Sequence, residues 1–215
     1  MNIKWLGHAS FLITSEEGLK IITDPYSLGG GIDYGKIEEV ADIVTVSHKH
    51  GDHDNVAAVK GKPEVVSALG SRRVKGVDFR GIPSYHDEAK GRQRGDNIIF
   101  CFTLDGIRIC HLGDLGHQLD ASQIAEIGEV DILLLPVGGV YTIDAKGATK
   151  VCEKLNPKVV IPMHYKTAKC GYPIARVDDF LRDRKNVRQL NASETEFKKE
   201  QLPPATETVV LKHAL

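Results

Sequence analysis

Three histidines and an aspartate are concentrated in residues 47–53 of this chain, SHKHGDH. A protein core would have to satisfy the polar atoms of these side chains, whereas imidazole and carboxylate groups are usual ligands of metal ions. The segment follows an apolar run, residues 43–46, that is typical of a buried strand, so the polar cluster begins where that strand ends. The potential donors are His48, His50, Asp52 and His53. Their types and spacing indicate a metal site rather than a solvated histidine-rich loop.

The spacing within this cluster suggests two neighbouring ions. In an extended segment His48, His50 and Asp52 project to one side. His53 points away from them unless the chain turns into the helix that residues 54–59 suggest. Such a turn can present His48 and His50 to one ion and Asp52 and His53 to the other.

The rest of the chain alternates segments typical of strands and helices. Short β-type segments open the chain at residues 3–6, 11–14 and 19–23, and a hairpin turn is predicted at Asp105-Gly106, between strands at 97–102 and 107–110. In the second half, helices are predicted at residues 121–127, 144–155 and 177–184, and strands at 130–135, 158–161 and 207–212. We therefore expect two β-rich halves, each followed by helices.

The motif His48-x-His50-x-Asp52-His53 resembles the signature of the metallo-β-lactamase superfamily of metal-dependent hydrolases. The pattern of that family also includes an Asp after an early strand, a separate His, a bridging Asp and a last His. The matching positions, in chain order, are Asp24, His86, Asp114 and His164. The resemblance covers nearly the whole chain and implies an α/β (α+β) fold, a four-layer αββα sandwich with metals at one edge of the paired sheets. The strand pattern alone would allow other α/β folds.

The resemblance also implies how the ligands are divided. His48, His50 and His86 would hold one ion, and the second ion would be held by Asp52, His53 and His164. Asp114 would bridge the two ions as a hard oxygen ligand, in the position where zinc-dependent β-lactamases carry a Cys. Asp52 and Asp114 are the catalytic residues that this resemblance implies.

Each of the isolated matches has a simpler interpretation. Asp24 precedes a proline and could be a turn residue; in relatives the equivalent Asp supports the His cluster more than it binds metal. His86 could be a solvated loop histidine, and His164 a capping histidine.

Further polar side chains are candidates for supporting or substrate-binding roles. The segment WLGHAS, residues 5–10, resembles the opening of the branch that includes ascorbate-6-phosphate lactonases and N-acyl phosphatidylethanolamine phospholipases; there His8 could line the pocket, although a lone loop histidine is more often structural. His111 and His117 are expected to support ligands rather than bind metal. Candidates for donating a proton or binding substrate are His8, His117, Tyr141 and Tyr165.

Composition sets broad limits on the class of protein. A chain of 215 residues with 41% hydrophobic content suits one large domain over residues 1–215. The 28 basic residues nearly cancel the charge of the 29 acidic ones, so the composition gives no electrostatic indication that the protein binds nucleic acid or an anionic membrane. The four cysteines are widely spaced, and no signal peptide or membrane span is apparent, so we expect reduced thiols and a cytoplasmic location. Oligomeric state is left open.

The expected chemistry is metal-assisted hydrolysis. Two cations about 3.5–4 Å apart would lower the pKa of a bridging water and stabilise the developing oxyanion. Zinc is the first expectation, and manganese or iron suits the same ligands. A phosphodiester or lactone is favoured as substrate. Alternatives are a metal-dependent binding or regulatory protein without turnover, and a thioesterase or nuclease of the same superfamily.

Departures from the family pattern argue against the specialised roles of glyoxalase II and of the superfamily's nucleases and redox members. Asp54-Asn55 stands where glyoxalase II relatives often have Gly-Gly, and no helical substrate domain follows His164. The chain also has no room for the long inserted domain of the superfamily's nucleases, and the flavin domain that its redox members usually carry is absent.

Short loops are expected to select the substrate. They span residues 26–35, 87–96, 138–142 and 166–172. Four basic residues lie in these loops, namely Arg92, Arg94, Lys166 and Lys169. They favour an anionic handle on a small-molecule substrate, bound above all by Arg94 or Lys166. The alternative is that they are ordinary solvated charges.

Overall fold

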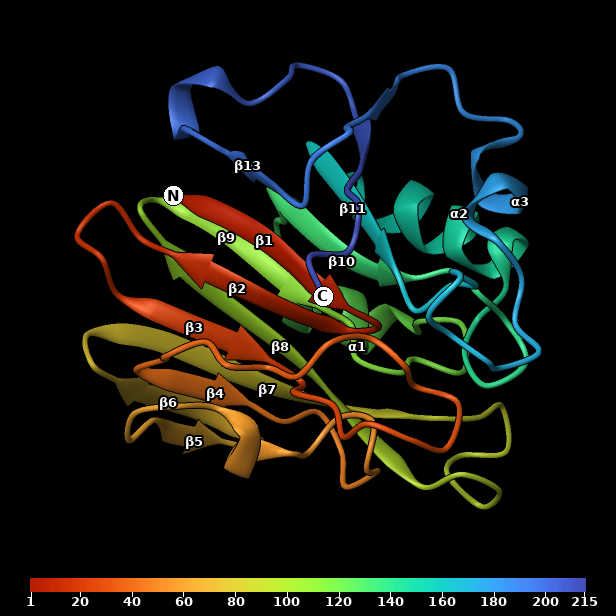
Figure 1. The fold of residues 1–215 in the computed structure, drawn as a ribbon. Helices are drawn as coiled ribbons and strands as arrows, with labels where there is room; N and C mark the ends of the chain where they lie inside the picture. The colour runs from red at the N-terminus through yellow and green to blue at the C-terminus, as the bar shows by residue number, and fades with distance from the viewer.

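Two mixed β-sheets are stacked face to face in the computed structural model, which describes residues 1–215 (Figure 1). The first sheet has the order β13-β1-β2-β3-β4-β5 and the second β12-β14-β11-β10-β9-β8-β7-β6. The strands of the first sheet are β1 (Asn2–Gly7), β2 (Ser10–Thr14), β3 (Lys20–Thr23), β4 (Ile43–Thr45), β5 (Glu64–Val66) and β13 (Glu194–Glu196). Those of the second are β6 (Gly70–Val74), β7 (Val77–Tyr85), β8 (Asp96–Leu104), β9 (Ile107–His111), β10 (Ile132–Pro136), β11 (Val159–Met163), β12 (Val187–Gln189) and β14 (Glu207–Val210).

The helices are few and follow strands of the second sheet. They are α1 (Ala121–Ile127), α2 (Ala145–Leu155) and α3 (Val177–Leu181), with 3-10 turns η1 (Val56–Ala58) and η2 (Lys199–Gln201). Asp120 and Asp144 cap α1 and α2 by accepting backbone N–H groups of the first turn. No helix combines the length and the apolar character needed to cross a bilayer.

Alternating side chains of the first sheet divide between two hydrophobic clusters. Trp5, Phe11 and Ile21 are fully buried in the large core shared with the second sheet. Their neighbours, such as Leu12 and Ile22, belong to a smaller cluster on the opposite face, where they are joined by three side chains of the long β3–β4 connection. Those three are Tyr26, Tyr34 and Ile37. The outer layer over the first sheet is therefore an irregular segment.

The predicted αββα fold is confirmed, with two differences in detail. The expectation that helices follow both halves is wrong for the first half, because the β3–β4 connection covers that face. The helix expected over residues 54–59 is only the single 3-10 turn Val56–Ala58. Helices predicted at residues 121–127, 144–155 and 177–184 are present with small changes at their ends.

The strand directions bring seven strand ends to one region. In the first sheet β1 runs in the same direction as β3 and β4, since β2 is antiparallel to β1 and β3 and β4 is parallel to β3. In the second sheet β9, β10 and β11 are parallel, and β7 joins their direction through antiparallel β8. The loops that follow these strand ends carry every residue in the histidine clusters described below.

Candidate metal centre

Asp114 lies at the centre of a group of histidines drawn from both sheets. Its Oδ2 atom is 3.1 Å from Nε2 of His86, 3.2 Å from that of His53, 3.3 Å from that of His164 and 4.0 Å from that of His48. The aspartate is only 2% exposed. One carboxylate oxygen thus faces four imidazole nitrogens in a region nearly closed to solvent.

His48, His50 and His86 form what we call the first cluster, in which the nitrogen donors lie within 4.8 Å of one another. His86 donates from Nδ1 to the backbone carbonyl of Tyr141 at 2.9 Å, which leaves its Nε2 free to bind an ion. His48 and His86 are buried, whereas His50 is exposed. The structure brings together the three residues that the motif assigned to one ion.

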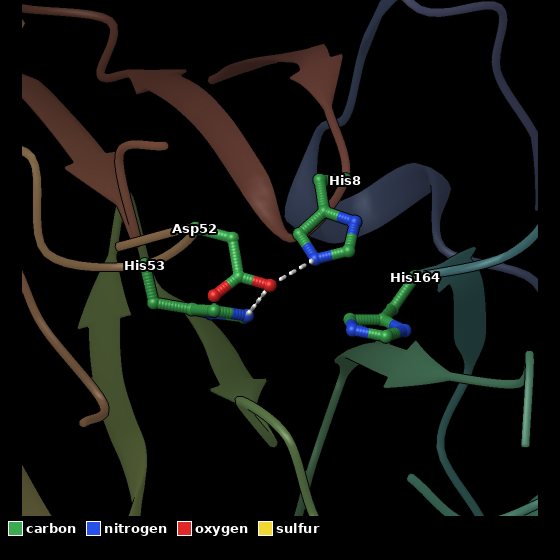
Figure 2. Close-up of side chains that lie close together, drawn as sticks. All are labelled: His8, Asp52, His53 and His164. Atoms are coloured by element: carbon green, nitrogen blue, oxygen red, sulfur yellow. Dashed lines mark ion pairs between the residues drawn. The ribbon is translucent and has the colours of Figure 1, made fainter. Parts of the chain in front are cut away.

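His8, Asp52, His53 and His164 form the second cluster, and their donor atoms also lie within 4.8 Å of one another (Figure 2). Oδ2 of Asp52 is 3.3 Å from Nε2 of His8 and 3.8 Å from Nε2 of His53. The His8 and His164 rings are 4.0 Å apart between centroids. Figure 2 shows the side chains converging from three segments of the chain, since Asp52 and His53 are consecutive residues. The sequence left open whether His8 lines the pocket or has a structural role. The structure places it in this cluster.

Asp24 is placed behind the second cluster, and its carboxylate supports His53. Its Oδ2 is 2.9 Å from Nδ1 of His53, while Oδ1 accepts the backbone N–H of Ser47 at 2.8 Å. The Ser47 hydroxyl also donates to Oδ2. These contacts orient the His53 ring so that Nε2 faces Asp114.

The buried side-chain amide of Asn97 helps to position Asp114. Asn97 accepts the Asp114 backbone N–H at 2.9 Å, and its own Nδ2 donates to Ser84 and Leu112. Gly113 has a φ of +53° and no room for a side chain, because a Cβ would lie 2.6 Å from that of Ser47. Sequence reasoning missed Asn97, since a polar residue near a strand start gives no signal of this contact.

Gly116 permits the close approach of the β7–β8 loop. A Cβ at this position would lie 2.3 Å from the backbone carbon of His86. Gly116 also donates its backbone N–H to the carbonyl of Tyr85. The glycine therefore allows His86 to reach Asp114.

The pKa values reflect burial and the charge of Asp114. Burial lowers the pKa of His48 to about 3 and that of His8 to about 4, so both rings are neutral at neutral pH. Burial also opposes charge on His53 and His86, but the Asp114 carboxylate, together with that of Asp24 at His53, outweighs it and raises the pKa of both. The centre thus favours a positive charge next to Asp114, which a metal ion can supply in place of protons.

Buried donor atoms without hydrogen-bond partners provide a direct test of whether metal ions fit here. They are Nε2 of His48, Nε2 of His53, Nδ1 of His164, Oδ1 of Asp114 and both ring nitrogens of His8. Each unsatisfied buried group costs about 1–3 kcal/mol unless something compensates it. Nitrogen and oxygen donors that lie together in the interior without partners suit divalent cations.

His111 and His117 have other partners. His111 donates from Nε2 to the carbonyl of Ala9 at 2.9 Å, and its Nδ1 accepts the backbone N–H of Gly113. His117 accepts the backbone N–H of Tyr85 at Nε2 and bonds the carbonyl of Gln118 through Nδ1. Both rings hold backbone segments near the centre.

Two other candidates also make structural contacts. The Tyr165 ring lies 5.0 Å from that of Trp5, and its hydroxyl donates to the carbonyl of Leu211. Lys166 donates to the carbonyl of Tyr172 at 2.8 Å and so fixes a rim loop. The structure directs neither side chain's polar atom to the histidines.

Tyr172 is a rim residue that the sequence did not single out. Its hydroxyl donates to Oδ2 of Asp52 at 3.2 Å, and its ring lies 5.8 Å from that of His8. Tyr141 packs against it with ring centroids 5.5 Å apart. The pair forms one wall beside the second cluster.

Arg94 borders a hollow at the first cluster. Its guanidinium lies 5.6 Å from the centroid of the Tyr141 ring. A hollow of about 500 Å³ is lined by Arg94 together with His48 and His50. A larger hollow, about 1160 Å³, lies beside α2 and α3 with no histidine in its lining. We place the candidate site by its clustered imidazole groups, which the larger hollow lacks.

Asp87 shapes the loop that carries Arg94. Its buried carboxylate accepts the backbone N–H groups of Ala89, Gly91, Gln93 and Arg94. These hydrogen bonds lower the pKa of Asp87 against the opposing effect of burial. The sequence placed this residue in a rim loop without indicating its role.

Comparisons with known proteins bear on the family and the fold of the chain. The model of the beta-lactamase superfamily domain matches residues 2–164. A UPF0173 metal-dependent hydrolase of Carboxydothermus hydrogenoformans is 36% identical over 205 residues, which cover 83% of this chain and 88% of that protein. A protein of the same name from Archaeoglobus fulgidus is 34% identical over 208 residues, covering 83% and 87%. A Thermotoga maritima crystal structure, named for a Zn-dependent hydrolase of the metallo-β-lactamase superfamily, has a TM-score of 0.81 at 40% identity and covers 98% of this chain and 97% of its own.

Proposed function

Because the chain belongs to the metallo-β-lactamase superfamily, within the UPF0173 metal-dependent hydrolases, we propose that it hydrolyses a small anionic ester at a centre of two metal ions. Metal-dependent hydrolysis follows from the family. The number of ions, the ester bond and the anionic handle are the proposal. A phosphodiester or a lactone is the substrate class we favour.

One observation carries this proposal, the position of Asp114. Its Oδ2 atom faces His48 and His86 of the first cluster and His53 and His164 of the second, all within 4.0 Å. A carboxylate between two sets of donors is suited to holding two cations together. A single-ion site would need neither the second set nor a carboxylate shared between the sets.

The proposal assigns the ligands to two metal ions. His48, His50 and His86 would hold one ion, and Asp52, His53 and His164 the other, with Asp114 contributing to both. When bound, such a pair of ions supplies an activated water and neutralises charge that develops on the substrate. Zinc is the first choice for these ligands, and manganese or iron suits them as well.

Arg94 is the best-placed residue to hold the anionic handle. It borders the hollow beside His48 and His50, and the Tyr141 ring supports its guanidinium. Arg92 instead donates to the carbonyl of Ala89. A guanidinium can bind phosphate or carboxylate through two parallel hydrogen bonds, which would orient the ester against the first cluster.

Turnover measurements on metal-free protein reloaded with one defined metal at a time test this proposal. The substrates are matched phosphodiesters, lactones and thioesters, each in an anionic and a neutral form. We expect metal-dependent turnover of an anionic phosphodiester or lactone, abolished in Asp114→Asn. Tight metal binding without turnover on the panel would favour a binding or regulatory protein, and preference for thioesters would favour the thioesterase alternative.

A further inference from the structure

We infer that His8 is a ligand of the metal ion in the second cluster, alongside Asp52, His53 and His164. The inference rests on the proposed two-ion centre and goes beyond it, since the motif alone assigns three protein ligands and the bridging aspartate to that ion. It makes the second cluster as rich in imidazole as the first.

The backbone holds His8 in an uncommon conformation. The residue follows β1 with a φ of +52°, in the left-handed region that non-glycine residues seldom adopt. Its carbonyl oxygen accepts two hydrogen bonds, from Nε1 of Trp5 at 3.0 Å and from the backbone N–H of His164 at 3.1 Å. Such a conformation costs about 1–3 kcal/mol and persists where the surroundings impose it. These two bonds fix the ring next to His164.

The His8 ring has no partner other than the cluster. It is 0% exposed, and neither ring nitrogen has a hydrogen-bond partner. His111 and His117 differ in this respect, because both ring nitrogens of each are hydrogen-bonded to backbone atoms. A buried, strained and unpaired imidazole is a net cost to folding unless a bound ion compensates it.

A simple hydrogen bond from His8 to Asp52 does not account for this arrangement. Nε2 of His8 and Oδ2 of Asp52 are 3.3 Å apart but lack hydrogen-bond geometry. Oδ2 already accepts the Tyr172 hydroxyl at 3.2 Å. A carboxylate oxygen has two lone pairs, so with an ion on the other one no acceptor position remains for His8. The separation of 3.3 Å suits two donor atoms that share one ion.

The consequence concerns open coordination positions. With His8, the second ion would have four ligands of its own besides Asp114, whereas the first ion has three. A catalytic ion keeps a position open for water or substrate. The first ion, beside the hollow and Arg94, would therefore be the more open of the two.

Cadmium NMR on the intact protein, loaded with two cadmium ions and nitrogen-labelled at histidine, tests the inference directly. We expect scalar coupling between a cadmium ion and a His8 ring nitrogen, as for His53 and His164. His117 is the internal control and should show none. Absence of coupling at His8, with coupling present at His53, would overturn the inference.

Metal affinity provides a second readout. His8→Asn is the variant of choice, because Asn tolerates the left-handed backbone that this position requires. Its affinity for the second ion should fall by more than the roughly 10–100-fold that loss of an outer-shell partner costs. His117→Asn, at a histidine whose ring nitrogens bond only backbone atoms, is the matched control and should lose no more than that roughly 10–100-fold. Unchanged affinity in His8→Asn would contradict ligation.

The outcomes separate this inference from the proposed function. Two bound ions with His8 coupled but no turnover on any ester would refute the hydrolytic proposal and support the ligand assignment. Turnover with two ions and an uncoupled His8 would do the reverse. Wild-type protein that binds a single ion would overturn both.

Discussion

The two histidine clusters face the same aspartate oxygen but differ in their contact with solvent. In the second cluster the rings of His8, His53 and His164 are at most 1% exposed. In the first cluster His50 is exposed and borders the hollow that Arg94 lines. Burial favours permanent retention of an ion, and exposure favours access of substrate. We therefore call the second cluster the anchoring half of the centre and the first cluster its accessible half.

The clusters also differ in how they are assembled. In each cluster two members come from the turn after β4 of the first sheet, and the first cluster is completed by His86, which follows β7 of the second sheet. The second cluster also needs the segments after β1 of the first sheet and β11 of the second, and a backbone hydrogen bond between His164 and His8 joins them. Both clusters therefore depend on the stacking of the two sheets, but the second draws on three chain segments and the first on two.

Substitution of Asp114 should have the largest effect, because both clusters depend on it. We expect Asp114→Ala to lower the metal content from about two ions per chain to one or fewer, with affinity losses above roughly 100-fold. Elemental analysis of protein purified without a chelating tag measures this. Asp114→Asn keeps the side-chain volume and controls for misfolding. Full metal content in both variants would rule out the shared role.

Partial chelation should reveal the difference in exposure. A limiting amount of chromogenic chelator should remove one ion at least about tenfold faster than the other, because solvent access differs between the clusters. His50→Ala should abolish the fast phase and retain the slow one. Release of both ions in a single phase would show that the two clusters exchange as one unit.

Stability of the metal-free protein should distinguish the clusters again. His53→Ala removes the partner of the buried Asp24 carboxylate and should lower the free energy of unfolding by about 1–3 kcal/mol. His50→Ala removes an exposed ring and should change it by less than about 0.5 kcal/mol. Urea denaturation of both variants after chelation gives the comparison. Equal losses would mean that Asp24 does not depend on His53.

The clusters show how far sequence alone could reach. The spacing of His48, His50, Asp52 and His53 is a local property, so their proximity could be predicted from the chain. Asp114 and His164 could be located because they follow strands, once the family pattern was considered. The structure places each of these side chains at the centre, while their roles as ligands remain part of the proposal.

Other features depend on contacts that local patterns do not encode. Tyr172 contacts Asp52, which lies 120 residues earlier in the chain. Asn97, at the start of the β8–β9 hairpin, accepts the backbone N–H of Asp114, which follows the end of that hairpin. The layer over the first sheet was predicted as helical, but the β3–β4 connection contributes apolar side chains without helical periodicity. Residues such as Tyr26 and Tyr34 therefore gave no sign that they would cover a sheet.

Substrate recognition should depend on the accessible half. Arg94→Gln should raise the KM of an anionic ester by roughly 10- to 150-fold, since a hydrogen bond to a charged group contributes about 1.5–3 kcal/mol. A neutral ester of similar size should be nearly unaffected. Arg92→Gln, on the same loop, is the matched control. Equal effects of Arg94→Gln on both esters would refute the anionic handle and leave the metal centre intact.

The smallest effect is expected at Tyr172, whose hydroxyl group makes one hydrogen bond to the second cluster. Tyr172→Phe keeps the ring between Tyr141 and His8 but removes the hydrogen bond to Oδ2 of Asp52. Because the net contribution of one such bond is about 0.5–1.5 kcal/mol, the affinity for the second ion should weaken by roughly tenfold or less. Competition with a metal buffer measures that affinity, and the first ion serves as the internal reference. If Tyr172→Phe released both ions equally, the hydroxyl would support the whole centre, and the distinction between an anchoring and an accessible half would fail at this residue.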